Sequence, residues 1–177
     1  MQDIEEILLP EEVISRRIQE LGAEIEAEES RDELTLLILL HGSVLFAADL
    51  MRALTTPVYL EALRVASYHG GTESSGTVTV ETTDLSHLQD RPVLLVDDIL
   101  DTGRTLKRVT THLREEVGVS SVRSCVLLDK QAQRAVDYAA DFVGFEIADQ
   151  FVVGYGLDYQ GRYRNLPFVG TLKPSAI

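Results

Sequence analysis

The stretch Val93–Thr105, with the sequence VLLVDDILDTGRT, decides the fold of this chain. It opens with apolar residues only, as in a strand that a parallel sheet buries on both faces. The acidic pair Asp97-Asp98 ends this run, and two adjacent carboxylates are costly to bury without partners. We therefore expect the pair at the end of a strand, near solvent or a ligand, and a turn over Asp98–Gly103.

Thr102–Thr105 (TGRT) provides hydroxyl groups, a glycine and backbone N–H groups at the start of a helix. Such N–H groups and the helix dipole favour a bound phosphate. The carboxylates before them suit the hydroxyls of a sugar, or a divalent cation held through water. Carboxylates that can bind sugar hydroxyls, followed by N–H groups that can bind a phosphate, match the two parts of a ribose 5-phosphate. An ordinary strand, turn and capped helix is the alternative interpretation, because Asp and Thr are common helix caps.

Apolar runs and helical patterns alternate on both sides of this stretch. Apolar runs predict strands over Leu34–Leu40, Val58–Tyr68, Val93–Asp97 and Val122–Leu128, with short strands or extended pieces at Phe142–Ile147 and Phe151–Val153. Helical spacing predicts helices over Pro10–Glu28, Val44–Leu54 and Arg104–Val117, the last stopped by Gly118. The alternating Thr77–Thr83 predicts the second arm of a hairpin whose loop is His69–Gly76. This order indicates an α/β domain with ligands at the carboxyl ends of its strands.

The size and composition of the chain fit one globular domain over residues 1–177, with 45% hydrophobic and 25% charged residues. No apolar run approaches the ~20 residues that cross a bilayer. Ile4–Pro10 is short and lies among acids, so we do not expect a signal peptide, and we expect a cytoplasmic protein. The single cysteine, Cys125, excludes an internal disulfide and lies in an apolar run, which predicts a buried, inert thiol.

The formal charge of −13 argues against a general role in binding nucleic acid, since such a surface repels phosphates. If the substrate is itself anionic, a bound cation or local positive groups must offset this field.

Val93–Thr105 resembles the PRPP-binding signature of the type I phosphoribosyltransferases, where PRPP is 5-phosphoribosyl 1-pyrophosphate. Further motifs on both sides of this stretch occur in the order seen in hypoxanthine-guanine phosphoribosyltransferases. They are Leu39–Ser43 (LLHGS), Ser67-Tyr68, Leu127–Lys130 (LLDK), Asp141–Asp149 (DFVGFEIAD), Phe151–Tyr159 (FVVGYGLDY) and Tyr163–Gly170 (YRNLPFVG). The resemblance covers roughly Leu34 to Leu172. It implies the type I phosphoribosyltransferase fold: a mostly parallel central sheet flanked by helices, a small hood built from terminal segments, and a flexible hairpin loop.

The activity that the resemblance implies is purine salvage. The phosphoribosyl group of PRPP would pass to hypoxanthine or guanine, giving IMP or GMP and pyrophosphate, with Mg²⁺ as cofactor. A homodimer or homotetramer is implied in the same way, with no nucleic acid or membrane partner. Two alternatives stay open: an enzyme that prefers xanthine, and a regulator that keeps the PRPP-binding fold but binds RNA. The regulator would need a basic face.

The resemblance assigns the ribose-phosphate site to Asp97, Asp98, Asp101, Thr102, Gly103, Arg104 and Thr105. Asp101 is the expected catalytic residue, which takes or shares the proton on the imidazole ring of the base. Asp149, together with Asp97 and Asp98, forms the expected metal set. The family more often has Glu at the position of Asp97, which is a conservative departure with a shorter reach.

The pyrophosphate end of the implied site consists of the loop Leu40-His41-Gly42, which often contains a non-proline cis peptide, and Arg134. The family usually has Lys or Arg at position 41, so a full cation is missing there unless His41 is protonated. Ser67-Tyr68 matches the mobile loop that closes over the reaction, and we expect His69–Ser75 to be disordered without ligands.

The purine end of the implied site consists of Lys130, Phe142 and Val143. Lys130 would donate to the 6-oxo group and so select hypoxanthine or guanine over adenine, which presents an amino donor there. The carbonyl of Val143 would accept a hydrogen bond from the base. The role of Phe151 is left open, with stacking on the purine as one option.

Overall fold

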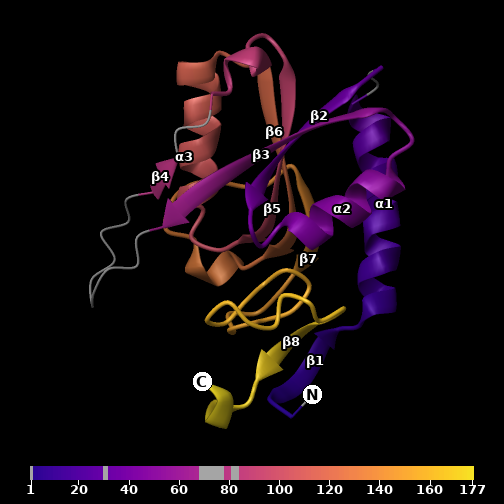
Figure 1. Ribbon diagram of the computed structural model, residues 1–177, viewed down its shortest axis with the longest axis vertical. Coiled ribbons are helices and arrows are strands. Elements are labelled where there is room, and N and C mark those ends of the chain that lie inside the picture. The colour runs from indigo at the N-terminus through magenta and orange to yellow at the C-terminus, as the bar shows by residue number, and fades with distance from the viewer. Residues whose placement is uncertain (1, 30–31, 68–77, 81–83) are drawn as a thin grey trace.

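The computed structural model of the chain describes residues 2–29, 32–67, 78–80 and 84–177 (Figure 1). Its main sheet has the strand order β4-β3-β2-β5-β6-β7. The strands are β2 (Leu34–Leu40), β3 (Val58–Ser67), β4 (Val78–Val80), β5 (Pro92–Leu100), β6 (Ser121–Asp129) and β7 (Phe142–Glu146). β4 runs antiparallel to β3, while β3, β2, β5, β6 and β7 are parallel. The predicted fold class is therefore confirmed.

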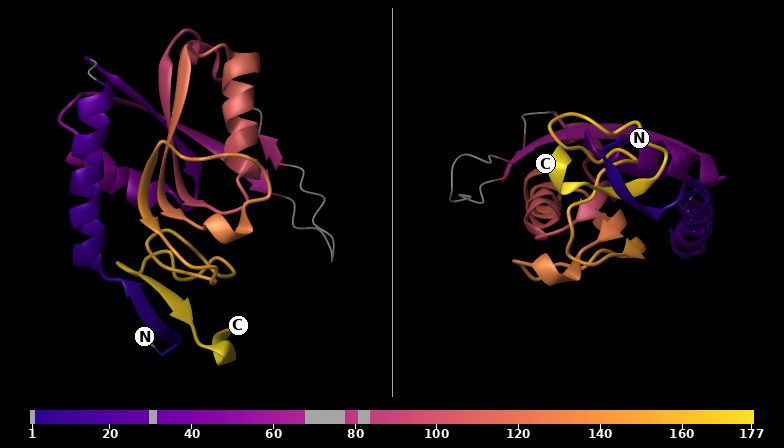
Figure 2. Two further views of the ribbon diagram at one scale, coloured as in Figure 1. Left: turned by 180° about the vertical axis from the view of Figure 1, so that it is seen from behind. Right: turned by 90° about the horizontal axis from the view of Figure 1, so that it is seen from below.

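The helices cover both faces of this sheet. They are α1 (Glu11–Glu29), α2 (Val44–Ala53) and α3 (Arg104–His112), with short helical turns at Ser86–Leu88, Gln131–Gln133 and Pro174–Ala176. Figure 2 shows α1 and α3 at opposite sides of the molecule. None of the helices in the described part of the chain is long and apolar enough to span a bilayer.

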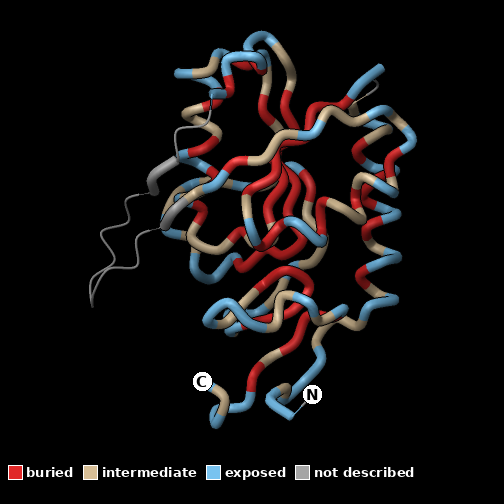
Figure 3. The backbone as a smooth tube through the Cα atoms, in the orientation of Figure 1, coloured by how far each residue is buried: buried red, intermediate tan, exposed pale blue. Residues whose placement is uncertain are grey.

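The central strands β2 and β5 are rich in apolar residues because each has a core on both of its faces. Leu36 and Leu94 pack into the core beneath α1 and α2. Their neighbours Leu37 and Leu95 point the other way, into the core beneath α3. Figure 3 shows the resulting run of buried backbone through the centre of the sheet. Cys125 belongs to the first core, and its burial raises the pKa of the thiol, as expected of an inert cysteine.

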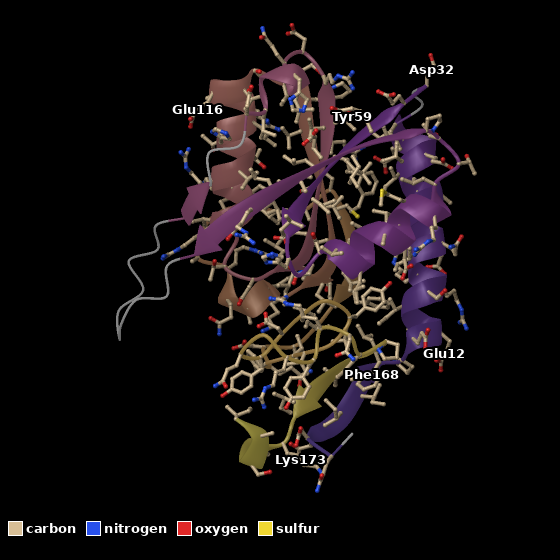
Figure 4. All side chains as sticks on the ribbon, in the orientation of Figure 1. Glu12, Asp32, Tyr59, Glu116, Phe168 and Lys173 are labelled. Atoms are coloured by element: carbon tan, nitrogen blue, oxygen red, sulfur yellow. The ribbon has the colours of Figure 1, made fainter. Side chains whose placement is uncertain are left out.

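A second, two-stranded sheet joins the two ends of the chain. β1 (Ile4–Leu9) pairs antiparallel with β8 (Val169–Leu172), and Lys173 Nζ donates to the carbonyl of Gln2 at 2.7 Å (Figure 4). Neither strand was predicted, because each finds its partner only at the far end of the chain. We call β1, β8 and residues 148–168 the hood, which lies below the main sheet in Figure 1.

Two element boundaries differ from the predictions. The turn expected over Asp98–Gly103 is wrong in its first half, because β5 continues to Leu100 through pairing with the end of β6. The helix expected to end at Val117 changes at Leu113 into a π-helical turn, which Gly118 stops with a φ of +78°. The hairpin arms pair antiparallel as predicted, whereas Tyr68 and the loop His69–Gly76 lie outside the described residues.

Candidate active site

The acidic pair lies near the carboxyl end of β5, where β5 pairs with β6. Asp97 is buried, and its Oδ1 accepts a hydrogen bond from the backbone N–H of Asp98 at 3.0 Å. Burial raises the pKa of Asp97 well above its ordinary value, and the charge of Asp98 acts in the same direction. Burial also raises the pKa of Asp98, against hydrogen bonds that lower it. Two carboxylates held this way favour a cation or hydroxyl donors beside them.

The loop that follows β5 holds an acid with an unused oxygen. Asp101 Oδ1 is buried and has no hydrogen-bond partner among the described residues. A buried acceptor without a partner is costly, which points to a ligand that donates to it. Directly after it, Thr102 Oγ1 accepts from the backbone N–H of Arg104 at 3.4 Å. Gly103, with a φ of +80°, precedes α3, so the N-terminal end of this helix, where N–H groups lack partners within the helix, follows the same loop.

The loop after β2 approaches the acidic pair from the neighbouring strand. Its Leu40–His41 peptide bond is cis, as the resemblance implied. Gly42 lies so close to Asp98 that a Cβ on Gly42 would be 1.8 Å from Oδ2 of that residue. The exposed ring of His41 lies beside Arg64 of β3, with 3.0 Å between His41 Nε2 and Arg64 Nη2.

Lys130 follows β6 at the same edge of the sheet. Leu100 and Asp129 are register partners, so Asp101 and Lys130 leave adjacent strands side by side. The backbone N–H of Lys130 donates to the carbonyl of Leu100 at 2.9 Å, and the residue is buried. The structure thus brings two acids, the start of α3, the loop after β2 and a buried lysine to one edge of the sheet.

Comparison with known proteins agrees with this geometry. Residues 6–160 match the phosphoribosyl transferase domain family. The chain belongs to this family. It is 44% identical over 172 residues to a Staphylococcus aureus protein named hypoxanthine-guanine phosphoribosyltransferase, covering 97% of this chain and 96% of that one.

Two solved structures of such relatives superpose closely. A hypoxanthine phosphoribosyltransferase from Staphylococcus aureus has a TM-score of 0.90 at 43% identity and covers 98% of this chain and 94% of its own. A mutant of the Trypanosoma cruzi hypoxanthine phosphoribosyltransferase, in a ternary substrates complex, has a TM-score of 0.90 at 37% identity and covers 99% of both chains.

Arg134, the expected pyrophosphate contact of this phosphoribosyltransferase, follows the helical turn after Lys130. Its Nη1 donates to the carbonyl of Asp101 at 3.0 Å, and its Nη2 forms an ion pair with Asp129. Arg134 therefore ties the loop of Asp101 to the end of β6. A guanidinium carries five N–H donors, so these two contacts leave donors over, and the pyrophosphate contact stays a prediction.

Phe142 and Val143 do not lie in the site, which corrects the expected base contacts. Phe142 is buried at the start of β7, where the guanidinium carbon of Arg123 lies 4.4 Å from the centre of its ring. The carbonyl of Val143 accepts from Nη2 of Arg17 on α1 at 3.0 Å. The ring of Phe142 and the carbonyl of Val143 thus contact arginines of the protein, away from the carboxyl ends of the strands.

Phe151 is the aromatic residue that the structure leaves open to a ligand. It is 49% exposed, and its ring meets that of Tyr159 edge to face, with 5.6 Å between the ring centres. Two residues earlier, Asp149 accepts a hydrogen bond from Gln133, in the helical turn that follows Lys130. This bond ties the hood segment of Phe151 to the loop of Lys130. The sequence predicted a short strand or extended piece at Phe151–Val153, and in the structure Phe151 lies outside the named strands.

Arg164 of the hood was missed by sequence reasoning. Burial raises the pKa of Asp98, and the positive charge of Arg164 opposes part of that rise. Its Nη1 donates to the carbonyl of Gly156 at 2.6 Å, and its Nη2 forms an ion pair with Asp158 at 2.7 Å. A Cβ on Gly156 would be 1.9 Å from the carbonyl oxygen of Gly42, so the hood backbone rests on the loop after β2. Arg164 is thereby held over the acidic edge.

The donor set for a metal ion consists of carboxylates. No group of three or more potential ligands occurs among the described residues, so the protein alone does not form a full cage there. Mg²⁺ is ordinarily held by one or two carboxylates together with substrate phosphates and water. The buried pair Asp97-Asp98 fits this role, since each carboxyl group is costly to ionise without a neighbouring cation. Asp149, the other expected ligand, is exposed and bound to Gln133.

Proposed function

We propose that this chain is a purine salvage enzyme that transfers the phosphoribosyl group of PRPP to hypoxanthine or guanine. The observation that carries the proposal is the unused, buried Oδ1 of Asp101, which lies between the acidic pair and the start of α3. An acid in that position can accept the proton that the base loses when its ring nitrogen is glycosylated. The names of the relatives support the same reaction.

The proposed sugar contacts follow from the order of groups along the loop. Asp97 and Asp98 bind the ribose hydroxyls, and the backbone N–H groups of Thr102–Thr105 hold the 5′-phosphate. The backbone amides after β2, at His41 and Gly42, receive the pyrophosphate. Bound at both ends, the sugar presents its anomeric carbon toward Asp101.

The proposed reaction is a displacement at the anomeric carbon. The bond from this carbon to the pyrophosphate oxygen breaks with its electron pair, and a bond to a ring nitrogen of the purine forms. The proton of the base goes to Asp101. Asp97 and Asp98 would hold Mg²⁺, which would supply positive charge to offset that of the leaving pyrophosphate. Asp149 remains a proposed second ligand, and Asp158, paired with Arg164 near Asp98, is a further candidate.

The hydrogen-bond donors of the site, matched to the donor or acceptor at position 6 of the purine, select the base. Lys130 presents only donors, which suits the 6-oxo acceptor of hypoxanthine, guanine or xanthine and opposes the 6-amino donor of adenine. Phe151, as an exposed aromatic side chain in the hood segment tied to the Lys130 loop, is the proposed stacking surface for the purine. Ser67, the last residue of β3, and Tyr68, which lies outside the described residues, stay proposed as part of a loop that closes over the reaction.

An assay of nucleotide formation with PRPP and Mg²⁺ tests the proposal. The bases are hypoxanthine, guanine, xanthine and adenine, and we expect turnover of the first two with none of adenine. A faster reaction with xanthine would move the assignment to a xanthine-preferring enzyme. Absence of turnover with all three 6-oxopurines, together with binding of RNA, would replace it by a regulator that keeps the fold.

The assembly and location are further parts of this proposal. We expect a homodimer or homotetramer in the cytoplasm. The exposed apolar side chains of Val44 and Leu45 on α2 and of Leu60 on β3 support self-association. Sedimentation equilibrium of the whole chain distinguishes these assemblies from a monomer.

A further inference from the structure

We propose that Asp129 is a positioning residue for the reaction: through Arg134 it holds the backbone of Asp101, the residue that receives the proton of the base. This inference rests on the proposed function and concerns a buried carboxylate to which the proposed reaction gives no role. Asp129 is the last residue of β6 and is 6% exposed. A carboxylate is costly to bury unless it is paired, so the partner of Asp129 indicates its purpose.

The partner of Asp129 is a cation that also reaches the loop after β5. Nη2 of Arg134 forms an ion pair with Oδ1 of Asp129, and Nη1 donates to the carbonyl of Asp101 at 3.0 Å. The stem of Arg134 lies along the same loop, because a Cβ on Gly103 would be 3.2 Å from Cδ of the arginine. One guanidinium thus joins the buried carboxylate to the backbone of the catalytic aspartate.

The neighbouring carbonyls of this loop are held in a different way. The carbonyl of Leu100 accepts from the backbone N–H of Lys130 at 2.9 Å. The carbonyl of Thr102 accepts from two backbone N–H groups of the segment after β6, at 3.0 and 3.3 Å. Between them, the carbonyl of Asp101 is bound by the side chain of Arg134. The backbone position of the catalytic aspartate therefore depends on how firmly that side chain is itself held.

The carboxylate of Asp129 holds the arginine in place. A free arginine side chain has many rotamers, but its planar group carries donors in a fixed fork, so an ion pair at one nitrogen orients the other. Asp129 is fixed in the sheet, since it pairs in register with Leu100 of β5 and with Glu146 of β7. Its carbonyl also accepts from the backbone N–H of Ile147 at 2.9 Å. Asp129 is thus a rigid anchor for a side chain that would otherwise move.

Asp129→Asn removes the charge of the anchor at nearly constant volume. We expect kcat to fall by about 10- to 100-fold, as for a displacement of about 1 Å at a catalytic group, while KM for PRPP changes by less than about twofold. A raised KM for PRPP with an unchanged kcat would overturn the proposal, because Arg134 would then act on the ligand and not through Asp101. The matched control is Asp141→Asn, just before β7, which removes an acid paired with Arg123 at 3.4 Å and should lower stability without lowering kcat.

A double-mutant cycle separates positioning from general damage. If Asp129 acts through Asp101, then Asp129→Asn should change kcat by less than about twofold in the Asp101→Asn background, where no base remains to be positioned. A merely structural role predicts equal losses in both backgrounds, and that result would overturn the proposal. Arg134→Lys keeps the charge beside Asp129 but lacks the planar fork, so it should fold like wild type and lose kcat in the same way. An unchanged kcat in Arg134→Lys would also overturn the proposal.

Hydrogen exchange of the folded protein gives a readout that does not depend on turnover. The backbone N–H groups of Ala135 and Val136 donate to the carbonyl of Thr102, so release of the loop should speed their exchange. We expect exchange at these two amides to be about tenfold faster or more in Asp129→Asn, with no change in the control variant. Unchanged exchange in Asp129→Asn would overturn the inference. A wild-type chain that turns over no purine, together with faster exchange in Asp129→Asn, would overturn the proposed function and leave the link from Asp129 to the loop standing.

Discussion

Gly42 lies against the carboxylate of Asp98: a Cβ at position 42 would be 1.8 Å from Asp98 Oδ2 and 2.6 Å from its Cγ. No side chain fits in that space without displacing the acid. The contact therefore couples the loop after β2 to the acidic pair on β5, and it makes the position of Asp98 depend on a residue with no functional group.

Gly42→Ala should consequently reduce catalysis far more than it reduces stability. Rotation of Asp98 away from the new methyl group would misplace a ribose contact, and a displacement of about 1 Å can lower a rate by about 100-fold. The measurement is kcat/KM for PRPP beside the thermal midpoint of unfolding. Gly161→Ala is the control, since its Cβ meets nothing within 4 Å but its φ is +77°. That variant should lose a little stability and keep its activity.

Asp101→Asn should lower kcat while KM for PRPP stays nearly constant. The buried Oδ1 has no partner in the described part of the protein, so a change at this oxygen breaks no hydrogen bond there. A positioned general base contributes roughly 100- to 10,000-fold, and we expect a loss in that range. Asp32→Asn, the same change of charge at the opposite end of the molecule from the hood (Figure 4), is the control. Equal kcat values for wild type and Asp101→Asn would remove Asp101 as the base.

Asp97→Asn should stabilise the protein in the absence of ligands. Burial raises the pKa of Asp97 above its ordinary value of 3.8, so the folded state binds this proton more tightly than the unfolded state. The resulting stabilisation is complete below 3.8 and is lost as pH rises through the raised pKa. The free energy of unfolding of Asp97→Asn should therefore exceed that of wild type by about 1 kcal/mol or more at pH 7, and by less at pH 4.

Chemical denaturation at both pH values measures the free energy of unfolding of Asp97→Asn. Asp84→Asn is the control, since its effect on that free energy should have the opposite sign. Ser86 donates its backbone N–H to Asp84 Oδ1 at 2.9 Å, and hydrogen bonds to Ser86 lower the pKa of this exposed acid. Its stabilisation is present above its ordinary pKa and lost as pH falls, so Asp84→Asn should destabilise the protein at neutral pH. A stability difference for Asp97→Asn that does not grow with pH would contradict the assigned cause.

The sequence predicted the parts of the site whose residues are contiguous in the chain. The run Val93–Thr105 contains its own strand, acids and helix start, and the structure reproduces that order. Arg64 and Arg164 could not be found this way. Arg64 reaches His41 because β3 pairs with β2, and Arg164 reaches Asp98 because the hood folds back over the sheet. Such positions depend on pairings between distant segments, which no short pattern contains.

Phe142 and Phe151 also show that a short sequence pattern does not contain the pairing of strands. Phe142 and Phe151 both precede a valine, and the sequence around each is apolar. Pairing of Phe142 with Cys125 of β6 buries the first in the sheet. Phe151 lies outside the strands of the main sheet and remains half exposed. Sheet pairing decides which of the two rings is buried, and on that ground we propose Phe151 instead of Phe142 as the ring that meets the base.

Phe151→Ala and Phe142→Ala should therefore have opposite effects. Stacking of a base on an aromatic ring contributes about 1–3 kcal/mol, so Phe151→Ala should raise KM for hypoxanthine by about tenfold. Its free energy of unfolding should change by less than about 1 kcal/mol, because the ring is 49% exposed. Phe142→Ala removes a buried ring beneath Arg123, which should cost about 3–5 kcal/mol of stability and leave KM nearly unchanged. Steady-state kinetics and urea denaturation of both variants check the pair, and a raised KM in Phe142→Ala alone would restore the original assignment.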